Sequence, residues 1–265
     1  MRGPTLPVPF FDTHAHLNLL PAECPFEEAY ARAVEGGLAG LVNIGTRIES
    51  SRESIALSER FSRVWATVGI HPSEAHGMTL EATEILDDLS LNPRVVGIGE
   101  TGLDAGDFPE TPLAVQAESL VRHIALARKR NLPLILHCRE AFGPLFDILD
   151  SEPLPERRGV FHCFTGSAKE AREALDRGFY LSLSGIVTFK NAQSLRDLLP
   201  AIPPDRLLIE TDCPYLAPVP YRGKTNQPSY LPETLKVVAG VLGRDPADLS
   251  LQLIENSRMF FELAL

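Results

Sequence analysis

The chain has few cysteines, and they are spaced too far apart for the usual metal or redox motifs. It contains four in 265 residues, at Cys24, Cys138, Cys163 and Cys213. This spacing excludes a CxxC motif and a zinc ribbon. Because nothing in the pattern indicates a disulfide framework, we expect a protein of a reducing compartment and place it in the cytoplasm.

Long apolar runs are also missing. Residues 1–9 contain one arginine and three prolines, but no apolar stretch typical of a signal peptide. No stretch elsewhere has the length of a transmembrane helix, so we expect no membrane-spanning segment. Nothing in the sequence indicates an obligate protein partner.

Positive charge is scarce. Lysine and arginine number 25 against 35 acidic residues, which gives a formal net charge of -10. Such a balance disfavours an extended basic surface for binding duplex DNA. A nucleic-acid substrate would have to be held locally, by metal ions and a few cationic side chains.

What the sequence does contain is a regular alternation of short apolar runs and helical patterns. The expected strands are residues 8–11, 40–44, 64–70, 95–99, 134–136, 159–161, 180–183 and 207–209. The expected helices are residues 26–35, 48–60, 80–89, 112–130, 142–150, 168–177, 192–199, 232–242 and 246–263. Nearly continuous apolar strands of this length are typical of a parallel sheet that is covered on both faces.

Eight such units in 265 residues predict an α/β fold, the (β/α)₈ TIM barrel, with residues 1–265 as a single domain. An open, doubly wound sheet is the alternative. No GxGxxG motif follows the first apolar run, which disfavours dinucleotide binding there.

Histidines and acids follow the predicted strands directly. In a barrel of this kind the carboxyl ends of the strands meet at one face, where catalytic residues lie. His14 and His16 end the first strand and, being two residues apart, point to the same side of it. The other residues at strand ends are His71, Glu100, His137, His162, Glu210 and Asp212. Polar side chains beside apolar strands need partners, and a metal centre supplies them.

Six of these side chains are candidate metal ligands. They are His14, His16, Glu100, His137, His162 and Asp212. Because this set exceeds the three or four ligands of one catalytic zinc site, two divalent ions fit better. Glu100 would bridge the ions through its two oxygens, and Asp212 would also be the base that takes a proton from water. The mixed donor set suits Zn, Mn, Mg or Ni.

Simpler explanations exist for single members of the set. Histidines can be hydrogen-bonded within a core, and Glu100 can be a salt-bridged acid at the rim of the barrel. His71 either contacts substrate or water, or has a structural role in its loop. We expect no functional role for His76 and His123, and we place His123 at the surface or in packing contacts of a helix.

Two acids are expected to support the ligands instead of binding an ion. Glu210 lies two residues before Asp212 on the same side of its segment. Asp104, in the sequence Gly102-Leu103-Asp104, either orients a ligand or closes a turn.

Three cations are expected to bind substrate. Arg139 follows His137 by two residues, and its guanidinium can bind a phosphate through two hydrogen bonds, with a rim salt bridge as the alternative. Arg222 and Lys224 lie in the loop after the eighth predicted strand, with glycine and asparagine nearby. That composition suits an anionic ligand, although a solvated surface loop would look similar.

Seven short motifs occur in a fixed order over nearly the whole chain. They are Asp12-Thr13-His14-Ala15-His16, Gly69-Ile70-His71-Pro72, Gly99-Glu100-Thr101-Gly102-Leu103-Asp104, His137-Cys138-Arg139, His162-Cys163-Phe164-Thr165-Gly166, Glu210-Thr211-Asp212-Cys213-Pro214-Tyr215-Leu216 and Arg222-Gly223-Lys224-Thr225-Asn226. Together they resemble the TatD-like metal-dependent deoxyribonucleases, within the wider amidohydrolase-type barrel hydrolases.

The resemblance implies a (β/α)₈ barrel with a divalent-metal centre that hydrolyses DNA phosphodiester bonds, as an exonuclease acting on a single strand or an end. It implies the same six ligands that the strand ends suggest. One feature departs from the family, which usually has an aromatic residue after the Leu-Asp of the fourth-strand motif. Here Ala105-Gly106-Asp107 follows, which affects base stacking but not the ligands.

Two other functions compete with the nuclease. A barrel hydrolase of another ester or amide, such as an amidohydrolase, a lactonase or an aminoacyl-tRNA deacylase, would activate water in the same way. Many amidohydrolases bridge their ions with a carboxylated lysine on the fourth strand, where this chain has Glu100. A barrel that binds metal without catalysis is the third hypothesis, although such sites are usually closed by protein ligands.

Overall fold

Eight strands and nine α-helices make up most of the part of the chain that the computed structural model describes, residues 7–106 and 111–264. Asp107 lies outside these residues. The strands are β1 (Phe10–Ala15), β2 (Leu38–Asn43), β3 (Val64–Val68), β4 (Val95–Asp104), β5 (Leu134–Arg139), β6 (Gly159–Phe161), β7 (Tyr180–Leu183) and β8 (Leu207–Ile209). The helices are α1 (Phe26–Glu35), α2 (Ile48–Arg60), α3 (Leu80–Leu89), α4 (Leu113–Arg130), α5 (Phe142–Ser151), α6 (Ala168–Asp176), α7 (Gln193–Leu198), α8 (Leu231–Leu242) and α9 (Pro246–Phe261).

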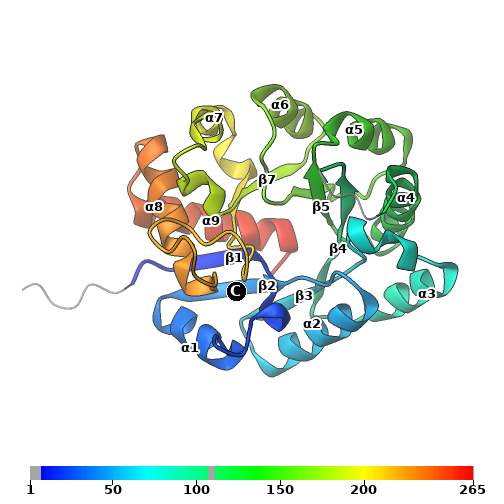
Figure 1. Cartoon of the computed structure of the whole chain (residues 1–265), viewed down its shortest axis with the longest axis horizontal. Coiled ribbons are helices and arrows are strands. Elements are labelled where there is room, and N and C mark those ends of the chain that lie inside the picture. Colours follow the sequence, from blue (N-terminus) through cyan, green and yellow to red (C-terminus); the bar gives the residue numbers. More distant parts are fainter. Residues whose placement is uncertain (1–6, 107–110, 265) are drawn as a thin grey trace, which may run out of the picture.

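The strands form one parallel sheet in the order of the sequence, from β1 to β8. Helices α1 to α8 are arranged around the sheet (Figure 1). The chain therefore folds as a nearly closed (β/α)₈ TIM barrel, and the predicted fold class is confirmed.

Backbone and side-chain hydrogen bonds join β1 to the segment after β8 and complete the barrel. Asp212 N donates to His14 O at 2.9 Å, and His16 N donates to Cys213 O at 2.8 Å. The buried Asp12 carboxylate accepts from Thr211 N at 2.9 Å and from Thr211 Oγ1 at 2.6 Å. These bonds hold the end of β1, where His14 and His16 lie, against Asp212, the acid that follows β8.

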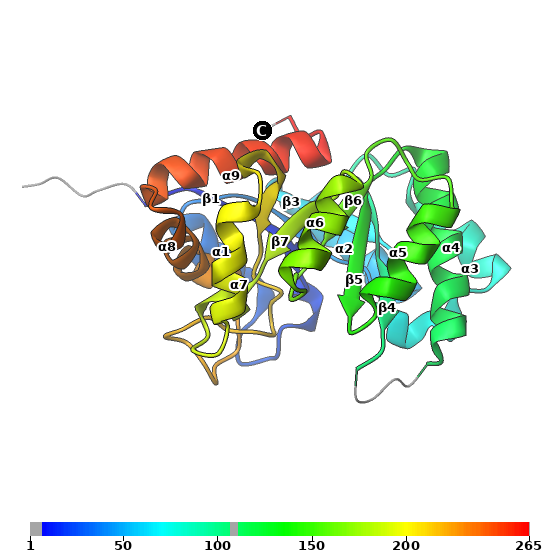
Figure 2. The same cartoon turned by 90° about the horizontal axis from the view of Figure 1, so that it is seen from above.

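The last helix closes the amino-terminal end of the barrel, while the long loops after the strands lie at the opposite end (Figure 2). Phe260 and Phe261 of α9 belong to a buried cluster with residues from seven strands, among them Phe11 and Trp65. Asn256 Nδ2 donates to Leu207 O at 2.8 Å and so ties α9 to β8. Because apolar side chains fill this end of the barrel, a polar functional site is expected at the opposite end.

Three strands continue past the carboxyl end of their apolar runs. One of them, β5, spans Leu134–Arg139 instead of residues 134–136 and so contains His137. β1 spans Phe10–Ala15 instead of residues 8–11, so His14 lies within the strand and not at its end. β4 spans Val95–Asp104 instead of residues 95–99, which likewise places Glu100 inside the strand. The apolar run stops at the first polar residue, but backbone pairing continues because these polar side chains find partners in the barrel.

Among the described residues, no helix combines the length and the apolar character that crossing a bilayer requires.

Candidate metal centre

One group of four donor atoms lies at the carboxyl ends of β1 and β8. The Nε2 atoms of His14 and His16 are 3.2 Å apart. Glu100 Oε2 lies 3.4 Å from His14 Nε2 and 3.6 Å from His16 Nε2. Asp212 Oδ1 lies 3.6 and 3.4 Å from the same two nitrogens. Each carboxylate oxygen thus lies within 3.6 Å of both histidine nitrogens.

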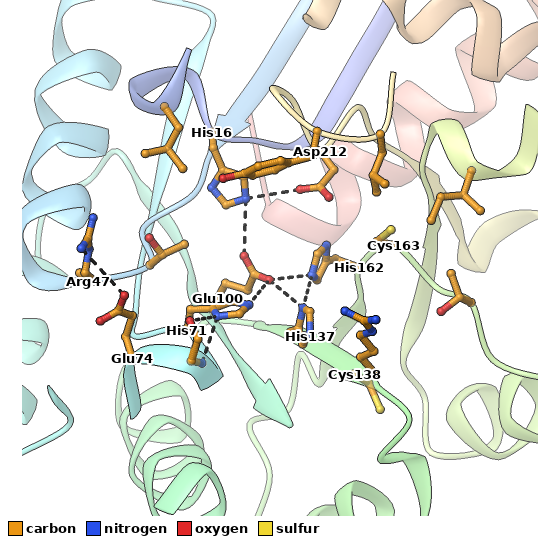
Figure 3. Close-up of a pocket in the computed structure, with 18 residues that line it drawn as sticks. His16, Arg47, His71, Glu74, Glu100, His137, Cys138, His162, Cys163 and Asp212 are labelled. Atoms are coloured by element: carbon orange, nitrogen blue, oxygen red, sulfur yellow. Dashed lines mark hydrogen bonds and ion pairs between the residues drawn. The ribbon is translucent and has the colours of Figure 1, made fainter. Parts of the chain in front are cut away.

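A second group lies around the other oxygen of Glu100. His162 Nε2 is 2.8 Å from Glu100 Oε1, and His137 Nδ1 is 3.1 Å from it. The two nitrogens lie 3.3 Å from one another. His71 Nε2 approaches the same oxygen at 3.4 Å. Figure 3 shows Glu100 between His16 on one side and His71, His137 and His162 on the other.

The spacing of these donors suits metal ions. With zinc–nitrogen bonds of about 2.1 Å, neighbouring ligands of a tetrahedral ion lie about 3.4 Å apart. The first group has separations of 3.2 to 3.6 Å, and all four donors are buried. Hydrogen bonding alone satisfies such a cluster poorly, since each nitrogen can point only one proton or one lone pair at three neighbours. A cation satisfies them all at once.

A break in the regular pairing of β4 brings Glu100 into the barrel. The register with β5 shifts between Ile98 and Thr101. Gly99 has φ of 139°, and a Cβ there would lie 2.5 Å from Ile135 O, so only glycine fits. Glu100 N donates to Gly45 O at 2.8 Å, which holds the carboxylate in place from the side of β2.

Asp104 orients His137. Its Oδ2 accepts a hydrogen bond from His137 Nε2 at 2.9 Å, while its Oδ1 accepts from Gly106 N at 2.8 Å. The bond to His137 outweighs partial burial and lowers the pKa of Asp104 to about 2. Because the proton of the ring is held at Nε2, the lone pair of Nδ1 is free toward Glu100. The two hydrogen bonds fit both roles expected of Asp104, orienting a ligand and closing a turn, and these roles stay predictions.

Glu210 contacts the second group through the His162 ring. Its Oε1 lies 3.3 Å from His162 Nδ1 and accepts from Cys163 N at 2.7 Å. Glu210 is fully buried. It touches the ring nitrogen of His162 that faces away from Glu100, so its position agrees with the supporting role expected from the sequence.

Mutual electrostatics keep the acids of the centre ionised. Burial by itself would raise the pKa of Glu100, but the charge of His162 and the bonds from neighbouring histidines hold it well below its usual range. For Asp212, burial is likewise outweighed by His16 and His14, and the pKa is lowered. Burial lowers the pKa of His71 to about 4, so this ring is neutral near pH 7. Carboxylate and imidazole donors suit divalent cations, which would take the place of the protons on the histidines.

A cavity of about 660 Å³ opens over the centre, a size typical of small-molecule sites. It is lined by His16, Leu19, Thr46, Arg47, His71, Ser73, Glu74, Glu100, His137, Cys138, Arg139, His162, Cys163, Thr165, Ile186, Asp212, Tyr215 and Leu216. His71 and Arg139 therefore reach the cavity, as a substrate contact requires. Arg47, Glu74 and Tyr215 were not expected to contact substrate. Arg47 and Glu74 lie outside the motifs, and in the motif that contains Tyr215 the sequence analysis singled out only the acids.

Arg222 and Lys224 do not line this cavity. The Arg222 guanidinium lies 3.9 Å from the centre of the Phe189 ring and donates to Ala217 O at 3.3 Å. Lys224 Nζ lies 5.6 Å from the centre of the Tyr221 ring. Aromatic neighbours that attract cations were not visible from spacing alone. Contact of these two residues with substrate stays a prediction.

His123 is not a surface residue. It is fully buried in α4, where its Nε2 accepts from Ile70 N at 3.0 Å and its Nδ1 donates to Ser119 O at 2.7 Å. This corrects the expectation of a surface position, although packing was the alternative. The ring anchors the segment that leads into His71.

Comparison with known proteins identifies the family. Residues 11–262 match the family described as TatD related DNase. The chain belongs to this family. It is 39% identical over 253 residues to YabD of Bacillus subtilis, named an uncharacterised metal-dependent hydrolase, covering 96% of this chain and 99% of that protein.

Other members agree in sequence and structure. A relative in Cronobacter sakazakii, named a 3'-5' ssDNA/RNA exonuclease, is 39% identical over 243 residues, which is 89% of this chain and 91% of the relative. The crystal structure of YjjV, a TatD homologue from Escherichia coli K12, superposes with a TM-score of 0.89 at 28% identity, over 96% of this chain and 98% of that one. The predicted family is confirmed, and the chain is a metal-dependent hydrolase of ester bonds.

Proposed function

We propose that this member of the family is a divalent-metal-dependent deoxyribonuclease, an exonuclease that acts on single-stranded DNA or a DNA end. The observation that carries the proposal is the position of Glu100, whose two oxygens each face a separate group of donors, at 2.8 to 3.6 Å. Such an arrangement suits two neighbouring ions, and paired ions are typical of phosphodiester hydrolysis.

Each donor group would hold one ion. His14, His16, Asp212 and Glu100 Oε2 would bind the first, and His137, His162 and Glu100 Oε1 the second. The donors suit Zn, Mn, Mg or Ni. When bound, two such ions supply positive charge to the phosphate and lower the pKa of water.

The residues of the chain then position substrate and move protons. Asp212 lines the cavity with an ionised carboxylate, and we assign it the base that accepts a proton from the attacking water. Arg139 lies at the end of β5 on the same cavity and would bind a phosphate oxygen. The neutral ring of His71 would donate to or accept from substrate.

The name of the Cronobacter relative, a 3'-5' ssDNA/RNA exonuclease, supports a single-stranded substrate and this direction. A compact cavity over the centre suits an extended strand better than an intact duplex. We also propose one functional domain and a cytoplasmic location, since the four cysteines are free thiols.

Degradation of a labelled single-stranded oligonucleotide tests the proposal. Protein reconstituted with Mg²⁺, Mn²⁺ or Zn²⁺ should shorten the strand stepwise from one end, and EDTA should stop it. We expect His14→Ala to lower the rate at least about a hundredfold, because a ligand is lost. His76→Ala, which removes an exposed histidine, is the matched control.

The same experiment separates the competing hydrolases. A cyclic amide, a lactone and an aminoacyl ester are offered beside the oligonucleotide. Turnover of one of these without any cleavage of DNA would overturn the nuclease. Unchanged nuclease activity in His14→Ala would overturn the assignment of the activity to this metal centre.

A further inference from the structure

The rim of the cavity is divided into an apolar arc and a polar arc. Three consecutive positions around the barrel supply the apolar arc, which consists of Ile186 after β7, Tyr215 and Leu216 after β8, and Leu19 after β1. The remaining loops supply polar and charged residues at the rim, namely Thr46, Arg47, Ser73, Glu74, Arg139 and Thr165. The metal donors lie on the floor between the arcs.

Tyr215 dominates the apolar arc. It is 53% exposed, and Leu19 beside it on the arc is 37% exposed. Among the described residues that line the cavity, it alone carries a phenyl or phenol ring. Its ring meets the His16 ring edge-on, with centroids 6.2 Å apart and an interplanar angle of 69°. A large apolar face is thus left open to solvent beside the first donor group.

The backbone of Tyr215 is held rigidly. Tyr215 N donates to Asp212 O at 2.9 Å, and its carbonyl oxygen accepts from Asn226 Nδ2 at 2.6 Å. The same asparagine side chain donates to Thr211 O at 2.8 Å. The turn that carries Asp212 therefore also fixes the backbone from which the Tyr215 ring extends, and the edge-on contact with His16 places the ring beside the centre.

We propose that Tyr215, assisted by Leu19, is the platform on which a base of the substrate stacks while its phosphate lies over the donor groups. This inference rests on the proposed nuclease function and deepens it. A nucleotide has an apolar face and an anionic end, and the two arcs of the rim match them. Every base has a π-face, so such a platform holds single strands without choosing a sequence.

An abasic scan tests the platform. Oligonucleotides that lack one base, at the terminal, second or third nucleotide from the degraded end, are compared with the intact strand. For the wild type we expect one abasic position to raise KM about tenfold with little change in kcat, because stacking binds the ground state and the transition state alike.

The decisive comparison is between that position and Tyr215→Ala. This variant should raise KM about tenfold for the intact strand, but less than twofold for the strand that lacks the stacked base. Tyr215→Phe keeps the ring and should stay within twofold of the wild type. Val219→Ala removes a 46% exposed apolar side chain from the same loop but away from the cavity, and it is the matched control.

A binding measurement covers the case in which Tyr215→Ala is poorly folded. In the metal-loaded Tyr215→Phe protein, 2-aminopurine at the same nucleotide of a cleavage-resistant strand should be quenched on binding, as in the wild type. Equal losses on intact and abasic strands, or no quenching at any position, would overturn the platform while leaving the nuclease intact. A wild type that cleaves no oligonucleotide would instead overturn the proposed function and the platform with it.

Discussion

At the scale of single residues, His137 shows how the chain prepares a ligand. Its two ring nitrogens have different partners, Asp104 at 2.9 Å from Nε2 and Glu100 at 3.1 Å from Nδ1. A carboxylate behind a histidine fixes both its tautomer and its orientation. Asp104, which lies outside the donor groups, is therefore as much a part of the centre as Glu100, which belongs to both groups.

Asp104→Asn should weaken the second ion selectively. The amide keeps the shape but loses the charge that holds the proton on His137 Nε2, and we expect metal affinity to fall roughly 10- to 100-fold. Competition with a chelator of known affinity measures the change. Asp87→Asn, which breaks a pair with Lys129 away from the cavity, should leave affinity unchanged. Equal affinity in Asp104→Asn and the wild type would contradict the role of Asp104.

Arg47 and Glu74 should act on substrate binding with opposite signs. They lie 3.9 Å apart at the cavity, and their side chains are 53% and 49% exposed. Arg47→Gln removes a cation that can bind a phosphate, so KM should rise severalfold. Glu74→Gln frees that cation and removes a repulsive charge, so KM should fall severalfold.

Salt dependence provides the check on this pair. The slope of log affinity for single-stranded DNA against log salt should shrink by about 0.7 in Arg47→Gln, the value for one lost phosphate contact on a single strand. If both variants changed KM in the same direction, the charges of Arg47 and Glu74 would not control phosphate binding.

The sequence reveals donors better than substrate contacts. The histidines and acids of the centre stand next to apolar runs, so their spacing exposes them. Arg47 has ordinary loop surroundings in the sequence, and Tyr215 lies in a motif in which only the acids were singled out. The folded rim shows that both residues face the cavity. The position of the Arg222 guanidinium against the Phe189 ring was likewise visible only in the fold, and its contact with substrate stays a prediction.

At the scale of elements, α4 and the turn after β3 are coupled through His123. Nε2 of the buried ring accepts a hydrogen bond from Ile70 N, and it can do so only when the imidazole is neutral. Burial lowers the pKa of His123 to about 4 from an ordinary value of 6.5. The unfolded chain therefore binds a proton between these values that the folded chain excludes, and stability must fall as the pH drops from 6.5 toward 4.

Replacement of His123 by phenylalanine should remove this pH dependence. At pH 7 we expect the variant to be less stable than the wild type, because Ile70 N loses its acceptor. The difference should shrink as the pH falls to 4, by up to about 3 kcal/mol. Urea unfolding of metal-free protein at several pH values measures it, and a difference that stayed constant with pH would contradict the coupling.

Element boundaries show where apolar patterning fails. Most helices begin and end within one residue of expectation, as for α2, because their amphipathic patterns are long. β1, β4 and β5 were placed short, because their polar residues His14, Glu100 and His137 point into the barrel and contact one another there. The register shift beside Gly99 has no signal beyond the glycines themselves.

At the scale of the whole molecule, the two ends of the barrel have different tasks. Phe260 and Phe261 fill the amino-terminal end, and donors fill the carboxyl end. With a net charge of -10, the protein repels DNA at long range, so binding depends on local charge at the rim and on metal ions. We therefore expect removal of the metal to abolish substrate binding while the protein remains folded.

The central claim is that Glu100 joins two metal sites. Anomalous diffraction from crystals of the Mn²⁺-loaded protein tests it most directly. The account predicts two peaks about 3.5–4 Å apart, one beside His14, His16 and Asp212 and the other beside His137 and His162. A single peak, or peaks away from the oxygens of Glu100, would contradict it.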